Sequence, residues 1–385
     1  MTPLDRPTYA RYLPRMGMLA LLCLIAYTAT AGWLPSEARS HVVVGAAILP
    51  LILANILYFS ATLTRSSQPP ASLWGWPLLG LLAGLVVIAA LSLDRRWALL
   101  GAVMAMVAVL GTLNWIRQRR KQCLGDPHPG LRWYEGALVS LLLGLVAISG
   151  GLLMPDYWAP LRSMHLHLNL IGFVGMTAIS TMQVLLPTAA KFQDTDVVRR
   201  LHQHAIWAMG GSLAFAVGAA GLHLFYLLGL GLWLRPLGAW ILSLWGFRDK
   251  IYGGGGATWP LLAALAGFMI MMFAGLLVAL GWLSAQNTLP LFFIGFLFPL
   301  LTGALTQLLP LWWWPGLETP LRSEARSAIE LGSPGRAAVY LVCGVGAALG
   351  YGWAAPLAAA AVAQFLLQVL VVRMKTPKMP PGNSF

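Results

Sequence analysis

The feature that most constrains the fold of this chain is its succession of long apolar stretches separated by short polar segments. A helix needs about 20 mainly apolar residues to cross the hydrocarbon core of a bilayer. Only 10% of the residues are charged, whereas soluble domains carry about 25%. The pattern predicts an all-α integral membrane protein and excludes a soluble enzyme, a disordered chain and a nucleic-acid-binding domain.

About twelve stretches are long and apolar enough to be transmembrane helices. The region 203–247 is long enough for two of them, although it lacks a polar loop and contains Arg235. The twelve predicted spans are about 15–34, 41–63, 73–92, 97–116, 133–154, 163–188, 203–224, 227–247, 259–283, 288–312, 336–353 and 355–373.

Basic residues set the predicted orientation, because cytoplasmic loops of membrane proteins are enriched in Lys and Arg. With the N-terminus inside, 20 of the 25 basic residues fall on the inner side. The outer side keeps Arg39, Arg95, Arg96 and Arg162, and Arg235 stays unassigned. Both termini are therefore predicted to be cytoplasmic, in a multi-pass protein of the bacterial inner membrane. The lipid bilayer is its expected partner, and the inner-loop bias explains the net charge of +13 without nucleic acid.

Short motifs recur along the chain and predict an internal repeat within one polytopic domain, 1–385. Gly32-Trp33-Leu34 recurs as Gly281-Trp282-Leu283. Ile171-Gly172-Phe173-Val174 recurs 123 residues later as Ile294-Gly295-Phe296-Leu297. The alternative is chance recurrence of Gly and Leu in apolar sequence, but the matching offsets and loop lengths argue against it. We predict three pseudo-symmetric four-helix units, at about 14–125, 131–255 and 258–378.

Histidines are the main candidates for chemistry, because polar residues inside a membrane are costly and are often functional. His41, His165, His167 and His223 all lie toward the predicted outer leaflet. Residues two apart on a helix point about 200° from each other, so His165 and His167 cannot both face one metal. Asn169 and Gly172 share the face of His165, whereas His167 is the one that aligns with His41 in the repeat.

A haem held between the second and sixth spans is the hypothesis that these residues suggest. Imidazole suits haem iron and copper, and His41, His165, His167 and His223 are the candidate ligands. Gly45 and Gly172 lack side chains and would let a flat macrocycle or a neighbouring helix approach closely. The alternative is that these histidines cap helices or form hydrogen bonds between them.

In layout the chain resembles the catalytic subunit of haem-copper oxidases, which has twelve helices in three arcs. His41 matches the haem-ligand position on the second helix, and His165 and His167 fall on the sixth. The span 288–312 has no histidine, however, and Asn169 stands where the family has Tyr in its His-x-x-x-Tyr pattern. A complete binuclear oxygen- or nitric-oxide-reducing centre therefore cannot be assembled from this chain.

The chain is also similar to the NnrS-like group of haem- and copper-containing membrane proteins, in length, in its histidine-led helices and in its basic inner loops. The His-Glu-Met motif of that group is His41-Val42-Val43 here. The resemblance implies a b-type haem, with copper as a second candidate cofactor. It also implies a role in nitric oxide, nitrosative-stress or respiratory redox metabolism, with a redox protein or a quinol as partner.

Two other functions remain open, and the sequence does not decide whether the protein is an enzyme. One is a transporter or permease, although acidic residues are nearly absent from the predicted spans and Arg235 is the only mid-span charge. A proton-coupled carrier usually needs a carboxylate there. The other is a non-catalytic subunit that anchors or assembles a redox complex, in which the histidines would be structural.

Overall fold

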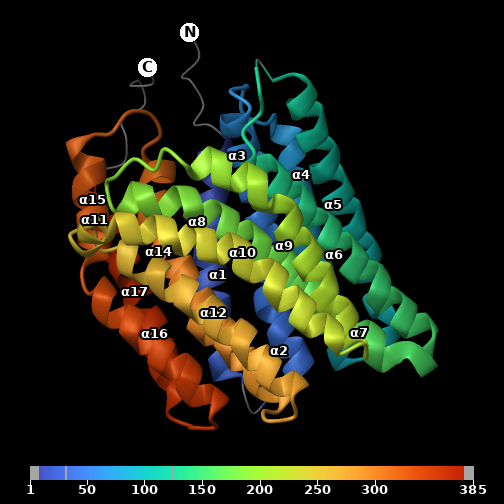
Figure 1. The fold of residues 1–385 in the computed structure, drawn as a ribbon. Coiled ribbons are helices and arrows are strands. Elements are labelled where there is room, and N and C mark those ends of the chain that lie inside the picture. Colours follow the sequence, from blue (N-terminus) through green and yellow to red (C-terminus); the bar gives the residue numbers. More distant parts are fainter. Residues whose placement is uncertain (1–7, 31–32, 124, 377–385) are drawn as a thin grey trace.

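The structure, a computed structural model, describes residues 8–30, 33–123 and 125–376. Within these ranges every regular element is a helix (Figure 1). Gly32 of the repeated Gly32-Trp33-Leu34 motif lies outside the described residues. Arg6 and Lys378, two of the 20 basic residues counted on the inner side, also lie outside them.

The first third of the chain begins with α1 and a long, continuous helix formed by α2, η1 and α3. Pro50 lies just after η1 inside this continuous helix and has no N–H to donate to the preceding turn. The elements are α1 (Thr8–Ala29), α2 (Ser36–Val43), η1 (Val44–Ile48), α3 (Leu49–Leu63), η2 (Ala71–Trp74), α4 (Gly75–Ser92), η3 (Arg95–Trp97) and α5 (Ala98–Lys121).

The second third again contains one long composite helix, made of α7, η5 and α8. The region 203–247 forms two helices, with a turn at 220–223 in which Gly221 takes a φ of +122°. Only glycine adopts such a conformation readily. The elements are α6 (Gly130–Leu153), η4 (Pro155–Tyr157), α7 (Trp158–His167), η5 (Leu168–Gly175), α8 (Met176–Ala189), α9 (Val197–Ala219), α10 (Leu224–Gly246) and α11 (Arg248–Tyr252).

The last third has a third composite helix, made of α13, η7 and α14. A short amphipathic helix, α15, then connects α14 to the last two helices of the bundle. The elements are α12 (Thr258–Ala279), η6 (Ala285–Asn287), α13 (Thr288–Pro290), η7 (Leu291–Leu297), α14 (Phe298–Trp313), α15 (Pro320–Glu330), α16 (Ser333–Ala348) and α17 (Ala354–Lys375).

Ten helices of the described chain are long and apolar enough to cross a membrane, which agrees with a multi-pass membrane protein. Two further bundle helices are not among these ten, namely α9, which has 23 residues, and α16, which has 16. The count of twelve spans and the cytoplasmic termini stay predictions.

Each composite helix contains a π-helical segment, in which the hydrogen bonds run from i to i+5 and the turn is wider than in an α-helix. These segments are η1, η5 and η7, and they begin at residues 44, 168 and 291. The second and third lie 123 residues apart, the same offset as the sequence motifs. Runs of π-helix are rare and are frequent at functional sites.

Small residues let neighbouring helices touch each π-helical segment closely, as is usual in membrane bundles. Gly45 of η1 lies against Gly84 of α4, with backbone on backbone. Gly295 of η7 is held in the same way between α12 and α16, at Gly267 and Gly344.

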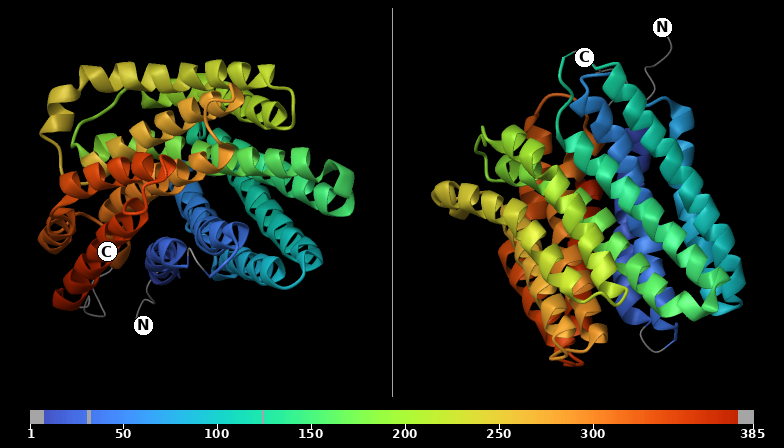
Figure 2. Two further views of the ribbon diagram at one scale, coloured as in Figure 1. Left: turned by 90° about the horizontal axis from the view of Figure 1, so that it is seen from below. Right: turned by 45° about the vertical axis from the view of Figure 1, so that its right-hand side comes forward.

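The helices close into a ring around this packed centre. The blue, green-to-yellow and orange-to-red parts of the chain occupy neighbouring sectors (Figure 2). Helix α6 packs on α5, α12 packs on α8 and α10, and α1 packs on α14 and α17. The contact between α1 and α17 joins the first and the last helix and closes the ring.

Candidate functional site

Two histidines from different parts of the chain face each other. The rings of His41, on α2, and His165, on α7, have centroids 6.3 Å apart and planes inclined by 11°. Each ring is partly buried and lies just before the π-helical segment of its composite helix. The π-helical segment and the close helix contacts that follow each histidine therefore fix the position of its Cα atom.

Backbone carbonyls orient both rings. The Nδ1 atom of His41 lies 2.8 Å from the Glu37 carbonyl oxygen, and that of His165 lies 2.9 Å from the Gly144 carbonyl oxygen. A carbonyl only accepts, so Nδ1 carries the proton and Nε2 holds a free lone pair. Neither Nε2 has a hydrogen-bond partner among the described residues, and this is the state in which imidazole binds a metal.

His167 points away from this pair, as expected for two positions separated by two residues on one helix. Its Nδ1 donates to the Ser163 carbonyl oxygen at 2.9 Å. Its Nε2 accepts a hydrogen bond from the Tyr226 hydroxyl of α10 at 3.0 Å. Both nitrogens are therefore occupied, which makes His167 a link between α7 and α10 in this structure.

His223 also lies apart from the pair. It is exposed at the start of α10, in the turn that follows α9. Across the residues that the structure describes, no group of three or more His, Cys, Asp or Glu side chains is placed to hold a metal ion. A metal at the His41–His165 pair would therefore have two protein ligands.

Asn169 contacts the backbone of His165, and Gly45 and Gly172 lie against neighbouring helices. The Asn169 side-chain amide donates to the His165 carbonyl oxygen at 2.6 Å, one turn back along the helix. Gly45 lies against Gly84 and beside the His41 ring, and Gly172 lies against Ser140 of α6 and Ser212 of α9. Neighbouring helices fill the space beside both glycines.

A charged rim lies next to the histidines. Glu37, whose carbonyl holds His41, pairs through its carboxylate with Arg162, one turn before His165, at 3.4 Å. Arg95 lies near the same carboxylate and over the Trp158 ring. The rim therefore holds two guanidinium groups and one carboxylate.

Sequence reasoning missed Glu37, Arg162 and Tyr226 as neighbours of the site. The first two have a local signal, since Glu37 is four residues before His41 and Arg162 is three before His165, both helical spacings. Tyr226 has no such signal, because it reaches His167 from another helix 59 residues away.

Comparisons with protein-family models and with curated proteins found no match to this chain. The functional argument therefore depends on the site geometry.

Proposed function

We propose that this chain is a haem-binding integral membrane protein in which His41 and His165 hold one haem. The observation that supports the proposal is the facing pair of imidazoles, each anchored at Nδ1 and each with Nε2 unpartnered among the described residues. A metal-binding histidine typically donates its second ring N–H to a carbonyl or carboxylate, and both rings do so.

The separation of the rings allows one metal ion to be bound by both. A metal–imidazole bond is about 2.0–2.1 Å long and the ring centre lies roughly 1.1 Å further, so the centroids of two imidazoles on one ion can lie at most about 6.3 Å apart. The observed centroid separation is 6.3 Å. Contact between two structural histidines without a shared ion does not require this spacing.

The ligand count favours haem over a lone copper ion. A porphyrin itself supplies four ligands to its iron, so two histidines would suffice to hold haem, whereas copper at this pair would need further ligands, and no third His, Cys, Asp or Glu among the described residues is placed to provide one. The cationic rim of Arg95 and Arg162 offers counter-charges for haem carboxylates. The sequence contains no CxxCH motif, so a non-covalently held, b-type haem is proposed.

A haem held by both histidines would supply electron transfer. The Glu37 and Gly144 carbonyls would keep the two imidazole rings oriented. The cations of the rim would balance the charge of the haem carboxylates. A respiratory redox role with a redox protein or a quinol as partner follows from this proposal, and a link to nitric oxide metabolism depends on the NnrS-like resemblance.

The proposed architecture is twelve spans in three four-helix units, with both termini cytoplasmic, in a bacterial inner membrane. Three observations support it. A π-helical segment occurs in each third of the chain, small residues pack against these segments, and the helices close into a ring.

The test is the absorption spectrum and iron content of the purified protein. We expect a Soret band and b-type haem, with loss of the band in His41→Ala and in His165→Ala. His167→Ala and His223→Ala are the matched controls and should keep it. A folded, colourless and iron-free wild-type protein would exclude haem and would leave the transport and assembly alternatives.

A further inference from the structure

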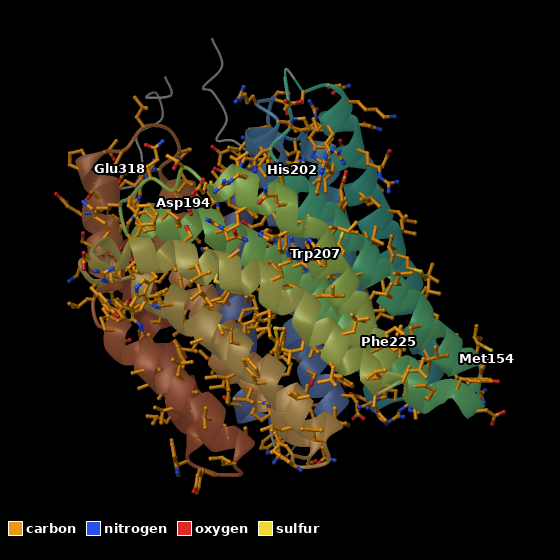
Figure 3. The ribbon with its side chains drawn as sticks, viewed as in Figure 1. Met154, Asp194, His202, Trp207, Phe225 and Glu318 are labelled. Carbon is orange, nitrogen blue, oxygen red and sulfur yellow. The ribbon has the colours of Figure 1, made fainter. Side chains whose placement is uncertain are left out.

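A cavity of about 820 Å³ lies at the end of the bundle opposite the histidine pair, where the first and second thirds of the chain meet. Its walls come from the C-terminal ends of α3 and α5, the 126–129 loop, and the N-terminal ends of α6 and α9. His202, on the α9 wall, lies at the end of the molecule far from Met154 (Figure 3).

The walls are rich in guanidinium groups. Arg65, Arg120, Arg132 and Arg199 all line the cavity, against Asp126 as the one lining carboxylate. Arg120 is neutralised by Glu135, and Arg199 pairs with Asp196 at 3.0 Å. Arg65 and Arg132 have no carboxylate partner among the described residues, so their charges are available to a ligand.

Two histidines also line the cavity. His202 Nε2 lies 3.2 Å from an Arg132 guanidinium nitrogen, which can only donate, so the ring accepts the hydrogen bond. His128 Nδ1 accepts a hydrogen bond from the Gly130 backbone N–H at 3.1 Å, and burial lowers the pKa of His128. The positive charge described above is that of the cavity's arginines.

The start of α9 adds backbone donors to the same cavity. Asp196 is the N-cap residue of α9, but its side chain does not cap the helix. The first N–H groups of a helix have no partner within the helix, and Val198 and Arg199, in the first turn of α9, line the cavity. Free N–H groups at a helix start favour an anion, and here they join the guanidinium groups described above.

We propose that this cavity binds a phosphate-bearing anion, held mainly by Arg65 and Arg132. Arginine forks match the oxygens of phosphate. The same phosphate chemistry has two sources at this position, namely the headgroup of an anionic phospholipid, which basic pockets between transmembrane helices bind, and a soluble phosphorylated molecule.

The test measures affinity for two probes with the full-length protein in phosphatidylcholine nanodiscs. One arm adds cardiolipin to the nanodisc, and the other titrates pyrophosphate. Binding is followed by the shift in melting temperature and by native mass spectrometry. We expect Arg65→Gln and Arg132→Gln each to weaken binding about fivefold, and the double variant about 25-fold, from the usual contribution of one basic residue near a membrane surface.

Arg248→Gln is the matched control. It removes one positive charge from an exposed residue of α11 that does not line the cavity, and it should leave binding unchanged. Melting without ligand reports folding, and each single variant tests the proposal if the double variant is unstable. Binding of cardiolipin alone identifies a lipid site, and binding of pyrophosphate identifies a site for a soluble ligand. Failure of both probes to bind, or equal binding by the double variant and the wild type, would overturn the proposal.

Discussion

At the scale of single residues, a buried charge connects three helices. The side chains of Arg200 and Asp194 are only 5% and 3% exposed, and they pair at 2.6 Å. Arg200 also donates to Gln183 on α8 and to Ser243 on α10. The sequence analysis counted Arg200 only as one of the 20 basic residues on the inner side, because a run of charges does not reveal which member is buried between helices.

Removing one member of this pair should be strongly destabilising, because it leaves the other charge buried and unpaired. We expect Asp194→Asn to lower the free energy of unfolding by about 3 kcal/mol or more. Asp196→Asn is the control, since its pair with Arg199 is exposed and such pairs contribute less than about 1 kcal/mol. Thermal unfolding in detergent measures both, and similar melting temperatures for the two variants would contradict the assignment.

A second residue-scale prediction separates a structural histidine from a ligand. Tyr226→Phe removes the hydroxyl that donates to His167 and should cost about 1 kcal/mol of stability. It should leave the Soret band unchanged if His167 does not bind the iron. A shifted or lost band in this variant would argue that the Tyr226–His167 contact belongs to the haem site. The sequence predicted that His165 and His167 diverge, but only the packing of α6 and α10 shows what each one faces.

At the scale of elements, the apolar pattern predicted where helices run but gave no sign of their wide turns. Every predicted span overlaps a helix or a composite helix, because bilayer thickness dictates stretch length, although four spans run several residues past the helix ends, at α1, α9, α12 and α16. The π-helical segments depend on tertiary packing, in which Gly45, Gly172 and Gly295 meet small residues of crossing helices. Recurring Gly at one offset was the only trace of this in the sequence.

The close crossing of α12 and η7 gives a prediction with a control on the same helix. A methyl group on Gly267 would overlap the carbonyl of Gly295, whereas one on Gly275 meets open space. Gly267→Ala should destabilise the protein by about 1–3 kcal/mol through overpacking. Gly275→Ala should be neutral or stabilising by up to about 1 kcal/mol, because alanine is the better helix former. Equal melting temperatures for the two variants would show that this crossing is looser than described.

At the scale of the whole molecule, a ring of helices separates two polar ends. Met154 and Phe225 lie toward one end, and Asp194, His202 and Glu318 lie toward the other (Figure 3). Charge counting predicted the orientation of these ends, since Lys and Arg are unequally distributed among the loops. It could not predict which loops meet, so the basic cavity between the first two thirds of the chain was visible only in the fold.

The proposed topology can be tested at α9, which is not among the ten helices that meet the apolar criterion. Its 23 residues would extend about 34 Å at 1.5 Å per residue, enough to cross a bilayer.

The two probe positions, Asp156 and Asp249, are both exposed and flank α7–η5–α8, α9 and α10. With Cys123, the one cysteine that is not buried, replaced by Ser, an impermeant maleimide should label Asp156→Cys in intact cells and Asp249→Cys only after lysis. Labelling of both in intact cells would mean that an even number of spans separates them and that α9 does not cross. Labelling of Asp249→Cys alone would place the termini outside, because it would invert the whole ring.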